Sequence, residues 1–294
     1  MNRDDALKKS DEALKELAAA LQAGKSETLI QYLDLVGRFH QYSFGNCMLI
    51  CLQRPDATMV AGFNRWKDLH RWVKKGEKGI AILAPLIRKR KSDESQTTPA
   101  HRGSNTDDSK KNNNDKVLIG FRVVHVYDVS QTDGKELPEF AKLGGDPSDL
   151  QPSLEELVAS HGIEMEYVDG LGGAHGVSLK GKIQVLESLH PAQKFSTTVH
   201  ELAHELLHRG DRRAETSKTV RETEAEAVAY VVCRWAGVDC STHASDYIQL
   251  YSGDETVLMQ SLELIREVSA KIISALDASR QQQAEVALEE VSNG

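Results

Sequence analysis

The stretch TTVHELAHELLHRG (residues 197–210) constrains the fold most, because it sets two histidines and a glutamate among regularly spaced apolar residues. The apolar positions follow a helical period, at Val199, Leu202, Ala203, Leu206 and Leu207. Such a helix belongs in a core, and a buried His or Glu needs a polar partner there. The sequence therefore predicts a core helix whose polar residues must be satisfied by something else.

On a helix, His200 and His204 are four residues apart and project from one face, so both rings could bind one metal ion. Glu201 is placed to take a proton from water at that metal and to pass it to a leaving amine. The ligand types favour Zn²⁺, with Mn²⁺ as an alternative. His-Glu-x-x-His is a short motif, so a polar cluster without metal and a metal site without peptidase activity both stay open.

The third ligand should come from a nearby helix, and the segment RETEAEAVAYVVCRWAG (221–237) fits, because its C-terminal part is apolar. We take Glu226 as the third ligand and Glu222, one turn away on the same face, as a residue that supports the ligands; the reverse assignment stays open. Glu224 points elsewhere and is expected in solvent. His208 extends the histidine series, but three ligands on one straight helix would span about 12 Å, so we expect it beside the ligands.

The segment between Arg54 and Lys91 is strongly basic, with eleven lysines and arginines against three acidic residues, in a chain of net charge −8. Aromatic and basic side chains alternate in it, as expected of a surface that binds single-stranded nucleic acid. The candidate DNA-binding residues are Arg65, Trp66, Lys67, Arg71, Trp72, Lys74, Lys75 and Lys78. The alternative is that Trp66, Leu69 and Trp72, at helical spacing, belong to a core.

The pattern along the chain predicts an α+β fold with two domains, at residues 1–143 and 144–294. Helices are expected at residues 4–22, 28–39, 44–54, 63–76, 154–162, 192–209, 218–236 and 255–290. Strands are expected at residues 80–87, 117–132, 163–168 and 182–187. Residues 88–116 are almost free of apolar side chains and are expected to be a disordered insertion between two paired strands. The helix at 255–290 is expected to pack on the second domain.

Composition argues against a membrane protein, because no run approaches the roughly 18 apolar residues that span a bilayer. The N-terminus is charged and helical in pattern and lacks the apolar core of a signal peptide. Four cysteines do not form a disulfide framework. A cytoplasmic location is the expectation.

Two segments resemble known families. YSFGNCMLICLQRPDATMVAGFNRWKDLHRWVKKGEKGIAILAP and VVHVYDVSQTDGKELP resemble the N-terminal domain of ArdC-type antirestriction proteins. VHELAHELLH followed by ETEAEAVAYVV resembles the zincin-like metallopeptidase domain of the ImmA/IrrE and SprT-like group. In that group a Glu of the second helix completes the metal site. KIQVLE resembles the edge strand along which such enzymes pair an extended substrate, which would place Glu187 facing the cleft.

The resemblance implies an α/β domain that binds single-stranded DNA, followed by a mostly helical zincin-like domain with a small sheet. It further implies an antirestriction protein that travels with conjugative plasmids and protects incoming DNA from host restriction. Protection could come from coating single strands, or from an action of the metal domain on a host restriction component. Three rivals remain: a regulatory metalloprotease that cleaves a DNA-bound repressor or host protein, a DNA-binding protein with a purely structural metal, and a primase accessory protein.

Overall fold

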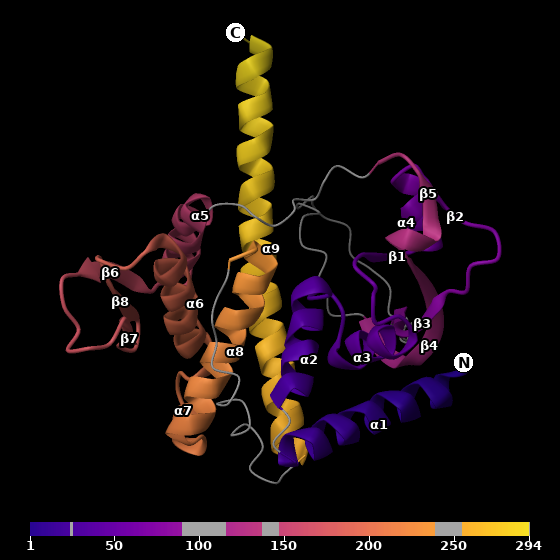
Figure 1. Cartoon of the computed structure of the whole chain (residues 1–294), viewed down its shortest axis with the longest axis horizontal. Helices are drawn as coiled ribbons and strands as arrows, with labels where there is room; N and C mark the ends of the chain where they lie inside the picture. The colour runs from indigo at the N-terminus through magenta and orange to yellow at the C-terminus, as the bar shows by residue number, and fades with distance from the viewer. Residues whose placement is uncertain (24–25, 90–115, 137–146, 239–254, 294) are drawn as a thin grey trace, which may run out of the picture.

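The computed structural model describes residues 1–23, 26–89, 116–136, 147–238 and 255–293, and mixes helices with three small sheets (Figure 1). The first half contains α1 (Arg3–Gln22), α2 (Ser26–Arg38), α3 (Phe44–Gln53), β1 (Val60–Gly62), α4 (Phe63–Asp68), β2 (Arg71–Val73), β3 (Ile80–Lys89), β4 (Lys116–Asp128), the 3₁₀ turn η2 (Val129–Gln131) and β5 (Thr132–Gly134). The second half contains α5 (Pro147–Ser160), β6 (Glu164–Val168), β7 (Gly176–Ser178), β8 (Lys182–Leu186), α6 (Pro191–Leu207), α7 (Arg212–Glu215), α8 (Lys218–Ala236) and α9 (Glu255–Asn293). The predicted α+β class is confirmed.

The N-terminal sheet has the order β1-β4-β3 and is antiparallel throughout. β3 and β4 pair from Ile80 opposite Val126 to Lys89 opposite Lys116, which confirms that the strands on either side of the predicted insertion are partners. Most of that insertion, residues 90–115, lies outside the described residues. Apolar residues of α2 and α3 pack on one face of the sheet to form a small core.

The outer edge of β3 is covered by side chains of α3. Asn46 donates to the Leu83 carbonyl and accepts from the Leu83 N–H, each at 2.8 Å. Gln53 makes the same pair of bonds to the Ala81 backbone, at 2.9 and 3.0 Å. The two amides therefore satisfy an edge that could otherwise pair with another chain.

The predicted helix at 63–76 is wrong beyond its first two turns. α4 ends at Asp68, His70 takes a left-handed φ of 55°, and residues 71–73 form β2, which pairs with β5. Trp66 is fully buried, whereas Trp72 on β2 is 56% exposed. Strand pairing outweighed the helical spacing of the two tryptophans, because residues 132–134 supply the backbone partners for β2.

The C-terminal sheet has the order β6-β8-β7, so β8 is its central strand, parallel to β6 and antiparallel to β7. The expectation that KIQVLE forms an edge strand is therefore wrong. The edge nearest the histidine helix is β7, a three-residue strand that packs against α6. The sequence pattern did not indicate β7, because three residues are too few to show a period.

The main core does not divide at residue 143. It joins α1 and α2 to α5, α6, α8 and α9, through residues such as Leu21 and Leu33 on one side and Leu202 and Val228 on the other. Asp34 of α2 also accepts hydrogen bonds from Tyr230 and Arg234 of α8, each at 2.9 Å. The first two helices thus pack in the same core as the second half of the chain.

α9 runs between the two groups of elements in Figure 1. Most of its apolar side chains from Leu258 to Leu276 are buried in the main core, as predicted, and Met259 and Leu264 pack against that core. Within the described residues, no helix combines the length and the apolar character needed to cross a bilayer.

Candidate metal centre

Helix α6 carries the motif. It begins after His190 with Pro191 at its first position, which suits a helix start, and ends at Leu207. Phe195, Val199, Leu202 and Ala203 are buried in the main core. The remaining face presents His200 and His204 towards α8, so the period that buries the apolar residues also aligns the two rings.

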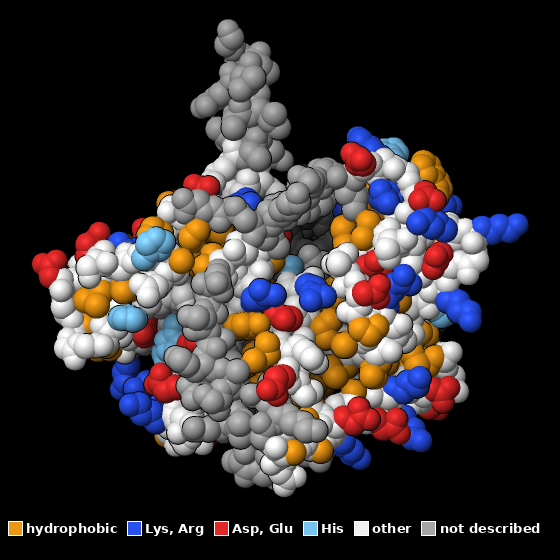
Figure 2. All heavy atoms as spheres, viewed as in Figure 1, with side chains coloured by type: hydrophobic (Ala, Val, Ile, Leu, Met, Phe, Trp, Pro, Cys, Tyr) orange, Lys and Arg blue, Asp and Glu red, His pale blue; other side chains and the backbone are white. Residues whose placement is uncertain are grey.

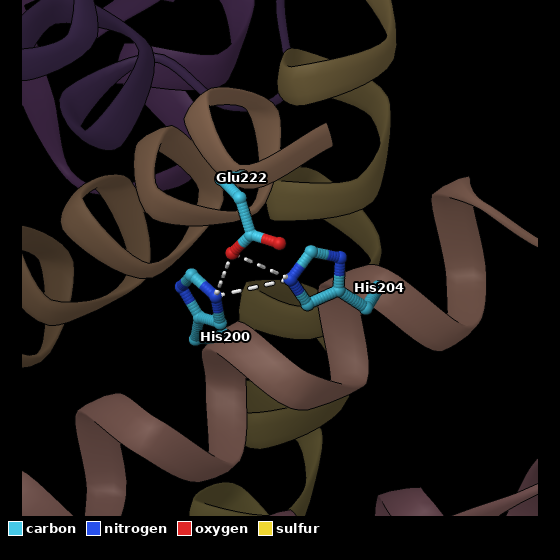
Figure 3. A group of neighbouring side chains, drawn as sticks. All are labelled: His200, His204 and Glu222. Atoms are coloured by element: carbon cyan, nitrogen blue, oxygen red, sulfur yellow. Dashed lines mark hydrogen bonds and ion pairs between the residues drawn. The ribbon is translucent and has the colours of Figure 1, made fainter. Parts of the chain in front are cut away.

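The two histidines converge with a glutamate of α8 (Figure 3). His200 Nε2 lies 3.1 Å from His204 Nε2, and Glu222 Oε2 lies 3.6 Å from the first and 3.4 Å from the second. These three atoms all lie within 4.8 Å of one another. Two imidazole nitrogens and one carboxylate oxygen are the donors of a typical three-residue zinc site with an open position.

Glu226 takes a different place from the one predicted. Its Oε2 lies 3.2 Å from His200 Nδ1, the ring nitrogen that faces away from His204. Glu226 is therefore placed to orient His200, while Glu222 lies next to both Nε2 atoms. The geometry favours the alternative assignment, in which the roles of the two glutamates are exchanged.

His208 links His204 to a buried carboxylate. His204 Nδ1 lies 3.1 Å from His208 Nδ1, and His208 Nε2 lies 2.8 Å from Glu224 Oε2. Glu224 also accepts hydrogen bonds from Arg212 and from Ser261 of α9. It is completely buried, so the expectation that it lies in solvent is wrong. The sequence spacing correctly predicted that Glu224 lies on a different face of α8 from Glu222 and Glu226. It did not indicate that α9 covers the face of α8 that carries Glu224.

These contacts fix the tautomers of His204 and His208. Burial lowers the pKa of His208, although hydrogen bonding to Glu224 raises it, and the ring is neutral at pH 7. Its Nε2–H then donates to Glu224, its Nδ1 accepts from His204, and His204 keeps an unprotonated Nε2. His200 is protonated at pH 7 without metal, because its pKa is raised; once deprotonated, it can donate its Nδ1–H to Glu226 and leave Nε2 unprotonated. In that deprotonated form two lone pairs and a carboxylate face one point, and a cation there would take the place of the His200 proton.

The pKa values of His200 and Glu222 also indicate a site that favours positive charge. Burial alone would lower the pKa of His200, but hydrogen bonds to Glu222 and Glu226 and the charge of Glu201 raise it to about 9. Hydrogen bonds from both histidines hold the pKa of Glu222 well below its usual range. A cluster that binds a proton this strongly also favours a divalent ion, because both are stabilised by the same negative charge. The residues thus fit a metal.

Glu201 is 7% exposed and lies beside the histidines. Burial raises the pKa of Glu201, while the two neighbouring histidines lower it, and the net pKa is raised. β7 lies against this side chain: a Cβ added to Gly176 would be 2.9 Å from Glu201 Cγ and 2.6 Å from Thr197 Cγ2. Only glycine leaves room there for Glu201 in its present position.

Some of the predicted DNA-binding residues have structural partners, and others are exposed. Trp66 is buried and donates its indole N–H to the Tyr127 carbonyl at 2.9 Å. The guanidinium of Arg71 is bonded to Thr132 and to the Lys135 carbonyl, and Lys74 donates to the Ser130 carbonyl at 3.0 Å. These three residues have structural partners. Lys74 nevertheless stays exposed, as do Arg65, Lys67, Trp72, Lys75 and Lys78.

Glu187, expected to face the cleft, follows β8 and pairs with Lys194 of α6 at 3.3 Å. Lys194 also lies over the Tyr167 ring, 4.5 Å from its centroid. The pair therefore fixes the end of the central strand to the start of the histidine helix.

Comparison with known proteins finds a family match for the first part of the chain. Residues 8–127 match the sequence model of the N-terminal domain of the anti-restriction factor ArdC. An uncharacterized protein of Bacillus anthracis is 24% identical over 282 residues, which cover 85% of this chain and 48% of that protein. The chain thus spans about half the length of this curated relative.

Two crystal structures of the antirestriction protein ArdC of plasmid R388 are also similar. The metal-free form gives a TM-score of 0.49 at 14% identity, over 92% of this chain and 98% of that one. The Mn(II)-bound form gives 0.44 at 16% identity, over 83% of this chain and 97% of that one.

Proposed function

Because residues 8–127 form an N-terminal domain of the ArdC type, we propose that the chain is an antirestriction protein of mobile DNA. The N-terminal part binds single-stranded DNA, and the second half is a zincin-like domain with one divalent metal ion. The family match supports the antirestriction role. The convergence of His200, His204 and Glu222 supports the metal.

His200 and His204 bind the ion through Nε2, and Glu222 completes the set through its carboxylate. Glu226 and the His208–Glu224 pair orient the two rings. Imidazole ligands favour Zn²⁺, and the carboxylate makes Mn²⁺ an alternative. We therefore assign Glu222, in place of Glu226, as the third ligand.

The reaction that suits this geometry is hydrolysis of a peptide bond. The ion supplies Lewis-acid chemistry at the substrate carbonyl and the attacking water. Glu201 takes the proton of that water and later delivers it to the leaving nitrogen. The raised pKa of Glu201 suits both steps, because a pKa closer to neutral pH lets the carboxyl group both accept and release a proton. A host restriction component is the proposed protein target.

The two activities are separable by substitution. Transfer of unmodified plasmid DNA into a restricting host is measured with the wild type and with Glu201→Gln, which keeps the size of the side chain and removes the base. The same proteins are tested for binding to a labelled single strand. We expect the wild type to raise the number of recipients that acquire the plasmid, and Glu201→Gln to bind the strand normally.

Full protection by Glu201→Gln would assign protection to DNA binding and leave the metal a structural role. If Glu201→Gln loses protection but still binds the strand, protection would be assigned to the metal domain. An absence of protection by the wild type would contradict the antirestriction role itself. Glu12→Gln, the same substitution at an exposed position of α1, serves as the matched control.

A further inference from the structure

Strand β4 turns a row of aromatic side chains away from the core. Alternate residues of a strand share a face, so Phe121, His125 and Tyr127 lie on the face opposite Val124 and Val126. Val126 is buried in the small core beneath the sheet, and Val124 packs against that core. Phe121 is 40% exposed, His125 is exposed and Tyr127 is half-buried.

Small residues of the neighbouring strands flank these rings. In the register of the sheet, Ala61 of β1 lies opposite Tyr127, and Ala81 of β3 lies opposite His125. Gly79 precedes β3, and a Cβ at this position would lie 2.8 Å from His125 Cβ and 3.1 Å from Tyr127 Cζ. Gly79 therefore packs closely against Tyr127 without a side chain of its own, while Phe121 and His125 stay exposed and can be approached by a flat group.

Helix α4 extends the row. Phe63 is 47% exposed, and its ring centroid lies 6.4 Å from that of Tyr127 in an edge arrangement. Lys67 lies over the Phe63 ring, with Nζ 4.9 Å from the centroid. Lys67 and Lys78 are exposed, and within the described part of the chain neither pairs with a carboxylate. Figure 2 shows lysine and arginine side chains spread over the side of the molecule that carries α4, β2 and β5, with apolar and acidic ones between them.

We propose that this aromatic face, defined as Phe63, Phe121, His125 and Tyr127 with Lys67 and Lys78, is the docking surface for single-stranded DNA. The inference rests on the proposed function and replaces the site expected around Trp66 and Arg71. Bases stack on the rings, and the lysines neutralise phosphates.

The occupant follows from the chemistry of the surface. Rings beside cations suit an anionic chain with flat, accessible groups, whereas the bases of a duplex are already stacked on one another. From Phe121 to Tyr127 the strand extends about 20 Å at roughly 3.3 Å per residue, which is enough for a few nucleotides. Stacking also tolerates any base, which suits a protein that meets DNA of varied sequence.

The test measures binding of the full chain to a fluorescent oligothymidine of about 16 nucleotides by anisotropy. Phe63→Ala/Phe121→Ala removes two exposed rings, so its effect on folding is small. We expect binding at least about tenfold weaker, from the usual contribution of base–aromatic stacking. Phe63→Tyr/Phe121→Tyr keeps the rings and should bind as the wild type does, and so should the control Leu179→Ala. Lys67→Ala should lower the slope of log Kd against log salt by about one.

Wild-type binding with an unaffected alanine double variant would overturn this assignment and leave DNA binding intact. Loss of binding only in Lys74→Glu/Lys75→Glu would place the strand at the turn after β2 instead. Equal competition by a duplex of the same length would contradict a single-stranded occupant. An absence of binding by the wild type would contradict the DNA-binding part of the proposed function, and the inference would fall with it.

Discussion

His208 Nε2 lies 2.8 Å from the buried Oε2 of Glu224, and this contact sets which nitrogen of His204 faces Glu222. The order of bonds from Glu224 through His208 to His204 leaves the Nε2 lone pair of His204 free for a metal. A carboxylate that touches neither the ion nor the substrate therefore has a defined role in the proposed site.

Glu224→Gln should weaken metal binding by about 10- to 100-fold, the usual cost of losing a residue that orients a ligand. A Gln can donate to His208 Nε2, which would reverse the hydrogen-bond order and turn a proton onto the Nε2 of His204. The measurement is competitive titration with a metal-sensitive dye. NMR of the ring nitrogens should show His204 changing tautomer in the metal-free protein.

Ser261→Ala is the control for that experiment, because it removes one hydrogen bond to Glu224 and leaves the contact with His208 in place. Its metal affinity should stay within a few-fold of the wild type. An unchanged His204 spectrum and unchanged affinity in Glu224→Gln would show that Glu224 only supports packing.

Gly176→Ala should move Glu201, because the added Cβ overlaps both Glu201 and Thr197. Overpacking of this kind costs about 1–3 kcal/mol of unfolding free energy. We expect a lower Tm, retained metal and impaired proton transfer by Glu201. Calorimetry and metal analysis check the first two outcomes. Gly170→Ala is the matched control, because a Cβ at Gly170 meets nothing within 4 Å.

Asp128→Asn should destabilise the N-terminal sheet in a pH-dependent way. The Asp128 carboxylate accepts from the backbone of Thr58 and Met59 and from both the N–H and the hydroxyl of Ser130. Burial raises the pKa of Asp128, but these bonds outweigh it and the pKa is lowered. The ionised form is therefore favoured by folding, so its stabilisation is present above the unfolded pKa of about 3.9 and disappears as the pH falls through the lowered value.

Urea unfolding at pH 7 should show Asp128→Asn less stable than the wild type by about 1.5–3 kcal/mol, the usual contribution of hydrogen bonds to a charged group. Below the lowered pKa of Asp128 the two proteins should converge, because the wild-type carboxyl group is then protonated. A difference that stays constant over this range would exclude a charge-dependent role.

The sequence predicted the helices and strands that are long enough to show a regular spacing of apolar residues. α6 and α8 lie within two residues of their predicted ends, and His200 and His204 face one point as expected. The choice between Glu222 and Glu226 was not predictable, because both lie on one face of α8. Which of them meets the histidines depends on how α8 crosses α6, and a linear pattern does not contain that crossing.

Other differences between the prediction and the structure also arise from partners that are distant in the sequence. Trp66 and Trp72 share a helical spacing, yet β2 forms because β5, about 60 residues later, pairs with it. The aromatic face depends on the register of three strands, which brings Gly79 beside Tyr127. Local periodicity indicates that a residue is buried or exposed, whereas partners distant in the sequence decide what it contacts.

Metal bound per chain, measured by mass spectrometry on the wild type, Glu222→Ala and Glu226→Ala, tests the proposed centre most directly. We predict close to one ion in the wild type, loss of the ion in Glu222→Ala, and weakened but measurable binding in Glu226→Ala, which keeps all three ligands. Metal retained by Glu222→Ala and lost from Glu226→Ala would contradict the assignment of the ligands. A folded wild type that binds no divalent metal would contradict the centre itself.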